Sequence, residues 1–137
     1  MGRILALDYG LKRTGIAATD PLQIIASPVT TVATKELFSY LKEYISREDV
    51  DTLVIGMPKR LDDSDTHSTG AIVKFISEFK SEFPQIEVVE EDERFTSKMA
   101  VQAMVAGGMK KKDRRKKENV DKISAVLILQ SYLESHS

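Results

Sequence analysis

The sequence predicts an α/β domain with a mixed five-stranded sheet and helices on both faces. Three apolar segments of strand length, at 3–7, 15–19 and 24–32, precede any helical pattern. Short apolar strands then alternate with segments of helical periodicity, which is typical of β-α units packed on a sheet. A length of 137 residues with no internal repeat or low-complexity linker fits a single domain over residues 1–137.

The first strand is predicted to be central. Its continuous apolar run ends at Asp8, which suits a strand covered on both faces. Segment 15–19 returns after a short turn, so the first two strands should form an antiparallel hairpin. The third strand, 24–32, contains Pro28, which a strand tolerates best at a sheet edge or a bulge.

Helical spacing and turn residues predict the remaining elements. Thr34 is placed to cap a helix that extends to about Arg47. The elements that follow are a strand at 52–55, a helix whose apolar face spans 72–79, a strand at 86–89, a helix from 96 to 104 before two glycines, and a last helix at 119–133. The predicted order is therefore βββαβαβαα.

Composition excludes several kinds of site. The chain has no cysteine, so it has no disulfide, thiolate zinc site or thiol nucleophile, and it suits a reducing compartment. Its first residues do not resemble a signal peptide, and no apolar run approaches the ~20 residues that span a bilayer. We expect a cytoplasmic protein with no membrane partner.

The charge is distributed unevenly along a chain of net charge −1. Segment 110–117 holds seven of the twenty Lys and Arg residues with one Asp, which leaves thirteen basic and twenty acidic residues elsewhere. The basic residues are Lys110, Lys111, Lys112, Arg114, Arg115, Lys116 and Lys117. The alternative is a solvated charged loop, but so dense a run beside acidic clusters favours nucleic-acid binding.

Asp8 is the first candidate functional residue. A carboxylate at the end of an apolar strand is unfavourable unless hydrogen bonds, neighbouring cations or a bound metal compensate its charge. Lys12 and Arg13 follow closely and could supply that compensation. The alternative is an aspartate that only caps the turn.

Two further acidic positions follow later elements. Segment 90–93 reads Glu-Glu-Asp-Glu at the end of a predicted strand, where α/β sheets commonly place their sites. Asp121 lies in the first turn of the last predicted helix. The alternative for segment 90–93 is a solvated strand end. The alternative for Asp121 is that its charge only interacts favourably with the helix dipole.

Taken together, these carboxylates suit Mg²⁺ or Mn²⁺, because both ions prefer oxygen ligands. Two such ions about 4 Å apart could hold the attacking and leaving oxygens of a phosphodiester. A cation would also compensate the charge of Asp8. The residues alone thus favour a metal-dependent phosphodiesterase.

Four segments of the chain resemble the YqgF/RuvX family of Holliday-junction-resolvase-like proteins, also described as pre-16S rRNA nucleases. They read LALDYGLKRTGIAATD, VIGMPKRLDDSDTHS, EEDERFTSKMA and VDKISAVLILQSYL, in the order and spacing of that family. The first motif and DERFT are the most specific. The resemblance covers nearly the whole chain.

The resemblance implies an RNase H-like fold, a cytoplasmic location and divalent-metal phosphodiester hydrolysis at the 5′ end of pre-16S rRNA. It implies catalytic roles for Asp8, Glu93 and Asp121, with Asp92 as the alternative to Glu93 as a metal ligand. The basic residues expected to contact nucleic acid are Lys12, Arg13, Arg60 and Arg94, together with the basic residues of segment 110–117.

The chain departs from the family at two places, and other functions stay open. It reads DDSD where the family commonly has Asp-Gly-Ser, and it has Ser124 where junction resolvases place a fourth carboxylate. The expected substrate is structured RNA or branched DNA, and the protein is expected to be a monomer or weak homodimer. Alternatives are a catalytically weak RNA-binding assembly factor and, because the first motif also resembles the actin and sugar-kinase phosphate loop, ATP chemistry.

Overall fold

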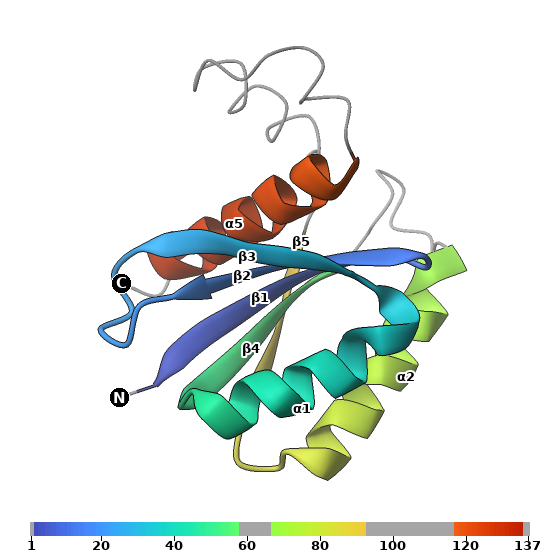
Figure 1. Cartoon of the computed structure of the whole chain (residues 1–137), viewed down its shortest axis with the longest axis horizontal. Coiled ribbons are helices and arrows are strands. Elements are labelled where there is room, and N and C mark those ends of the chain that lie inside the picture. Colours follow the sequence, from blue (N-terminus) through green and yellow to red (C-terminus); the bar gives the residue numbers. More distant parts are fainter. Residues whose placement is uncertain (1, 58–66, 93–116, 136–137) are drawn as a thin grey trace.

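The structure of the chain is a computed structural model that describes residues 2–57, 67–92 and 117–135 (Figure 1). The elements are β1 (Arg3–Tyr9), β2 (Arg13–Thr19), β3 (Ala26–Ala33), the 3₁₀ turn η1 (Thr34–Glu36), α1 (Leu37–Arg47), β4 (Val50–Met57), α2 (His67–Glu82), β5 (Glu87–Asp92) and α5 (Lys117–Ser135). The helix predicted from 96 to 104 lies outside the described residues. No helix in the described part of the chain combines the length and apolar character needed to cross a membrane.

The five strands form one mixed sheet in the order β3-β2-β1-β4-β5. The central strand β1 pairs antiparallel with β2 and parallel with β4. Farther out, β3 pairs antiparallel with β2, and β5 pairs parallel with β4. The predicted mixed sheet with a leading hairpin is confirmed. Pro28 lies on the edge strand β3, beside the register shift between Ile16 and Ala17, which is where a proline interrupts pairing least.

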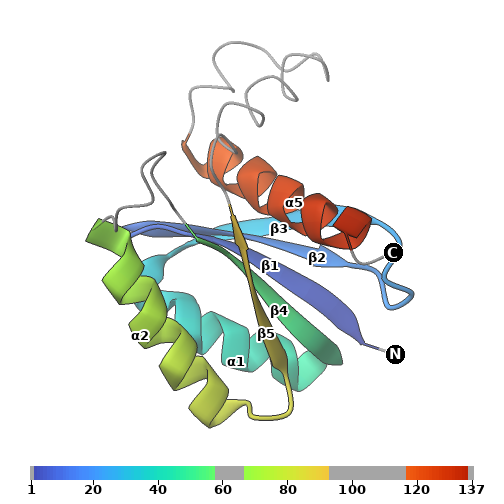
Figure 2. The ribbon, with the colours of Figure 1, turned by 180° about the vertical axis from the view of Figure 1, so that it is seen from behind.

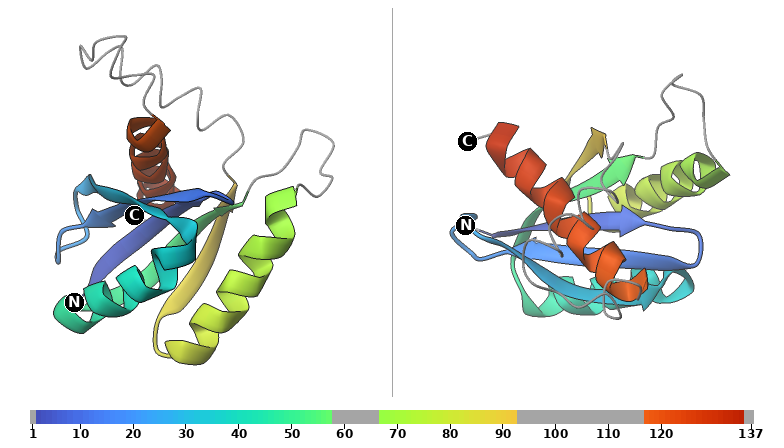
Figure 3. Two further views of the ribbon diagram at one scale, coloured as in Figure 1. Left: turned by 45° about the vertical axis from the view of Figure 1, so that its right-hand side comes forward. Right: turned by 90° about the horizontal axis from the view of Figure 1, so that it is seen from above.

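Two helical layers cover the sheet, with α1 and α2 on one face and α5 on the other (Figures 1 and 2). Alternation along β1 divides its side chains between the layers. Leu5 and Leu7 belong to the apolar cluster with α1 and α2, whereas Ile4 and Ala6 belong to the cluster with α5. Seen from above, α5 crosses the strands on the face opposite α1 (Figure 3). Each face of β1 therefore has its own core.

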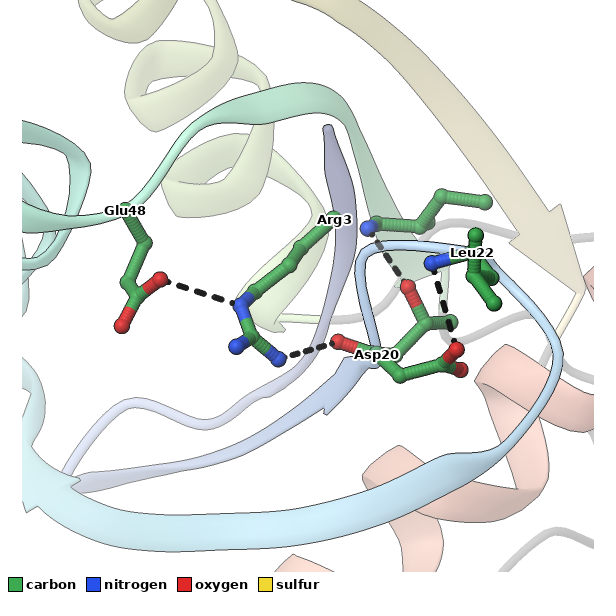
Figure 4. A network of polar contacts seen from close by, with 6 residues as sticks. Arg3, Asp20, Leu22 and Glu48 are labelled. Carbon is green, nitrogen blue, oxygen red and sulfur yellow. Dashed lines mark hydrogen bonds and ion pairs between the residues drawn. The ribbon is translucent and has the colours of Figure 1, made fainter. Parts of the chain in front are cut away.

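The third strand begins later than predicted because Asp20 organises the preceding residues into a loop. Its carboxylate accepts hydrogen bonds from the backbone N–H groups of Leu22, Ile24 and Ile25 at 3.1, 2.9 and 2.8 Å. These bonds, led by that from Ile25, hold the pKa of Asp20 below its ordinary value. Figure 4 shows this turn beside Arg3. The strand starts at Ala26 instead of at position 24.

Thr34 does not cap α1 as predicted. The chain first forms the turn η1, and α1 has Glu36 at its N-cap with no side-chain hydrogen bond. The hydroxyl of Thr34 instead donates to the carbonyl oxygen of Gly10 at 2.6 Å and lies 3.0 Å from the hydroxyl of Thr14. A residue predicted to start a helix therefore ties that helix to the turn between β1 and β2.

Candidate functional site

Asp8 lies near the end of the central strand, one residue before β1 ends. It is half-buried and pairs with Gly15 across the hairpin. Ile4 and Ala6 face the α5 layer, and side chains alternate along a strand. The carboxylate of Asp8 is therefore on the face of the sheet that α5 covers.

The parallel strands β1, β4 and β5 end at the same edge of the sheet. Their register aligns Leu7 with Ile55 and Ile55 with Glu90. In the next row, Gly56 pairs with Glu91, and the β1 position that continues this row is Asp8. Two acidic residues thus share one row, with a glycine between them.

Glu91 faces α5, as Asp8 does. Val89, two residues earlier on β5, packs against the apolar cluster under α5. Burial raises the pKa of Tyr132 on α5, and the negative charges of Glu87 and Glu91 raise it further. The Oε2 atom of Glu91 is buried and accepts no hydrogen bond within the described part of the chain.

The other predicted acidic residues approach the same edge, insofar as the structure describes them. Asp92 is the last residue of β5, and Asp121 is in the N-terminal part of α5; their side chains are not among those described. Seen from above, α5 begins at the end of the sheet where β1 ends, over β2 and β3, and crosses the strands from there (Figure 3). Glu93 lies outside the described residues. Backbone placement therefore brings Asp8, Asp92 and the start of α5 to one edge.

Two of the predicted basic residues lie in the described hairpin. Lys12 is exposed in the turn, and its carbonyl oxygen accepts a hydrogen bond from the Thr34 N–H at 3.0 Å. Arg13 is half-buried at the start of β2. Both belong to the end of the sheet where Asp8 lies. Lys117 is the first residue of α5, and the predicted residues outside the described ranges are Arg60, Arg94, Lys110, Lys111, Lys112, Arg114, Arg115 and Lys116.

The described side chains provide part of an oxygen-ligand set. Among residues 2–57, 67–92 and 117–135, no group of three or more His, Asp or Glu side chains could hold a metal ion. Asp8 and Glu91 are nevertheless two carboxylates on one face of one row, and an oxygen of Glu91 is buried without a hydrogen-bond donor. Buried polar atoms are nearly always paired. These two residues fit a hard, oxygen-coordinated cation.

The sequence interpretation did not single out Glu91. Within the acidic segment 90–93, the interpretation assigned the ligand to Asp92 or Glu93. Successive side chains of a strand point to opposite faces, so only half of this segment can face the site. Val88 and Val89 are both apolar, so the sequence does not show which half that is. The packing of Val89 against the cluster under α5 settles the face, and the pairing of Gly56 with Glu91 sets the row; both are long-range contacts.

Gly10 lies in the tight turn two residues after Asp8, so we expect Gly10→Ala to damage both stability and activity. A Cβ atom on Gly10 would lie 2.5 Å from the carbonyl oxygen of Arg13, and backbone must move to relieve that contact. Overpacking of this kind lowers the free energy of unfolding by about 1–3 kcal/mol. Urea unfolding and cleavage rates would measure the two effects.

The matched control is Gly70→Ala in α2, where an added Cβ meets nothing within 4 Å. Alanine in place of glycine in a helix should raise the free energy of unfolding by up to about 1 kcal/mol. Cleavage should stay at the level of the unsubstituted protein. A Gly10→Ala protein as stable and active as the Gly70→Ala protein would contradict the role of the turn.

The chain is similar to known proteins over nearly its whole length. Residues 2–135 match the family model described as "RuvX: Holliday junction resolvase". A protein of Amoebophilus asiaticus named "Putative pre-16S rRNA nuclease" is 52% identical over 136 residues, 99% of this chain and 96% of the relative. One of the same name from Christiangramia forsetii is 54% identical over 133 residues, 97% of this chain and 98% of the relative.

The fold is also that of solved RuvC structures. RuvC of T. thermophilus in complex with a Holliday junction substrate superposes with a TM-score of 0.62 at 13% identity, covering 98% of both chains. A second structure of Thermus thermophilus RuvC gives a TM-score of 0.58 at 14% identity, covering 97% of this chain and 96% of that one. The predicted RNase H-like fold is confirmed.

Proposed function

We propose that this chain, which belongs to the RuvX (YqgF) family, is a cytoplasmic metal-dependent nuclease that processes the 5′ end of pre-16S rRNA. The observation that carries the proposal is the half-buried carboxylate of Asp8 at the end of β1, on the face that α5 covers. The names of relatives at about half identity over nearly the whole chain support the substrate.

The chain's own residues would have three tasks in this reaction. Asp8, with Glu93 or Asp92 and Asp121, would hold Mg²⁺ or Mn²⁺. When bound, the cation supplies charge stabilisation for the phosphodiester and lowers the pKa of a water. Lys12 and Arg13, at the same end of the sheet, would hold the phosphate backbone in place. The basic residues of segment 110–117 would add salt-sensitive affinity for the nucleic acid.

The test is cleavage of end-labelled RNA that carries the 16S 5′ leader, beside a labelled four-way DNA junction. We expect metal-dependent products from the RNA with Mg²⁺ or Mn²⁺, none with EDTA, and weaker cleavage of the junction. A preference for the junction would transfer the proposal to branched DNA. Filter binding of the same RNA completes the test, because binding that weakens steeply with salt but yields no products would indicate an assembly factor instead.

A further inference from the structure

Two buried polar atoms border the layer between the sheet and α5 without a hydrogen-bond partner in the described part of the chain. They are Oε2 of Glu91 and the Oγ of Ser124, a residue that is 1% exposed. A buried polar group without a partner is destabilising, by about 1–3 kcal/mol in proteins and more for a charged group. Such atoms call for a ligand that the described part of the chain does not supply.

The position of Glu91 identifies what kind of ligand that is. Asp8, Gly56 and Glu91 occupy one row across three parallel strands, and both carboxylates face α5. Gly56 has no side chain, so the middle strand places no side chain between the two acidic residues on this face. The glycine leaves room for both carboxylates to approach the same point.

Strand geometry sets the size of that space. Neighbouring strands are about 4.8 Å apart, so the Cα atoms of Asp8 and Glu91 are separated by about 10 Å. Side chains that lean toward each other from Cα atoms this far apart can bring their oxygens to about 2.1 Å from a Mg²⁺-sized ion between them. Without a cation, two carboxylates so close would repel each other.

We propose that Glu91 is a ligand of the divalent cation bound by Asp8, reaching it across Gly56. The inference rests on the proposed metal-dependent function and adds a residue to its site. Mg²⁺ is commonly held by one or two carboxylates together with substrate phosphates and water, so this pair suffices to begin a site. The cation is the missing partner of Glu91 Oε2.

The test compares Glu91→Gln with Glu87→Gln by calorimetric titration of Mn²⁺ into the full chain. Glu87 lies on the same strand and the same face as Glu91, and its negative charge also raises the pKa of Tyr132. It is four residues before Glu91, however, and so outside the row that contains Asp8. We expect the dissociation constant for Mn²⁺ to rise at least about tenfold for Glu91→Gln and to change less than about twofold for Glu87→Gln.

A thermal melt with and without Mn²⁺ gives a second readout that does not depend on activity. Metal-free Glu91→Gln should melt no lower than the unsubstituted protein, because it removes an unpaired buried charge, and it should lose most of the rise in Tm that Mn²⁺ produces. A lower Tm without metal, combined with normal Mn²⁺ affinity, would make Glu91 a structural residue and overturn the inference.

Asp8→Asn separates this inference from the proposed function. If Asp8→Asn loses Mn²⁺ binding and Glu91→Gln keeps it, the metal site stands and the role of Glu91 is wrong. If the unsubstituted protein binds no Mn²⁺, the proposed function and the inference fall together.

Discussion

Asp8→Asn is expected to abolish phosphodiester cleavage and to leave the fold intact. Asparagine keeps the size of the side chain but removes the negative charge that a cation requires. We expect the cleavage rate to fall at least about a thousandfold, which corresponds to about 4 kcal/mol of transition-state stabilisation. Initial rates on the labelled 16S leader RNA with Mg²⁺ measure this loss, and circular dichroism confirms that the sheet is retained.

Asp51→Asn is the matched control for this experiment. Asp51 lies near the start of β4, at the opposite end of the sheet, where its carboxylate accepts hydrogen bonds from the Gly2 N–H at 2.9 Å and from Gln23 Nε2 at 3.1 Å. Its loss should affect stability without affecting the cleavage rate of the folded protein. Cleavage that survives Asp8→Asn would remove Asp8 from the active site and leave it as a carboxylate of the turn.

The central part of the fold was predictable because its signals are local. A continuous apolar run predicts β1, since a strand buried on both faces needs no alternation, and β1 contributes Leu5 and Leu7 to one core and Ile4 and Ala6 to the other. Pro28 likewise indicated an edge strand, because proline cannot donate a ladder hydrogen bond.

The errors arose where a hydrogen bond to a residue outside the predicted element decides the structure. Ile24 and Ile25 look like strand residues, yet they are 66% and 64% exposed, because their N–H groups bind the side chain of Asp20 instead of a neighbouring strand. Thr34 has the composition of a helix cap, yet its hydroxyl binds Gly10, 24 residues away. Local propensity carries no information about either partner.

The candidate site was predictable in its residue types and only partly in its members. Asp8 could be identified because a charge at the end of an apolar strand is unusual. Glu91 could not be, because its role depends on which face of β5 it occupies and on its pairing with Gly56. The ligands predicted at Glu93 and Asp121 stay predictions, since their side chains are not among those described.

Phe79→Ala should remove a large part of the stability of this domain without touching the site. Phe79 is fully buried in the α1 and α2 layer, with ring centroids 5.9 Å from Phe75 and 4.9 Å from Phe83. Replacing a buried phenylalanine by alanine typically lowers the free energy of unfolding by about 3–5 kcal/mol, through lost burial and the cavity that remains. Total stabilities of such domains are about 5–15 kcal/mol, so urea unfolding should show the loss clearly.

Val73→Ala on the same helix is the control, because Val73 is 54% exposed and should change the free energy of unfolding by less than about 0.5 kcal/mol. The sheet separates the layer of Phe79 from the face that carries Asp8 and Glu91. The folded fraction of Phe79→Ala should therefore bind Mn²⁺ with unchanged affinity, whereas Glu91→Gln should change affinity without lowering stability. Reduced Mn²⁺ affinity in folded Phe79→Ala would show that the two layers are coupled through the sheet. A decrease in the free energy of unfolding of less than about 1.5 kcal/mol would show that neighbouring side chains fill the cavity.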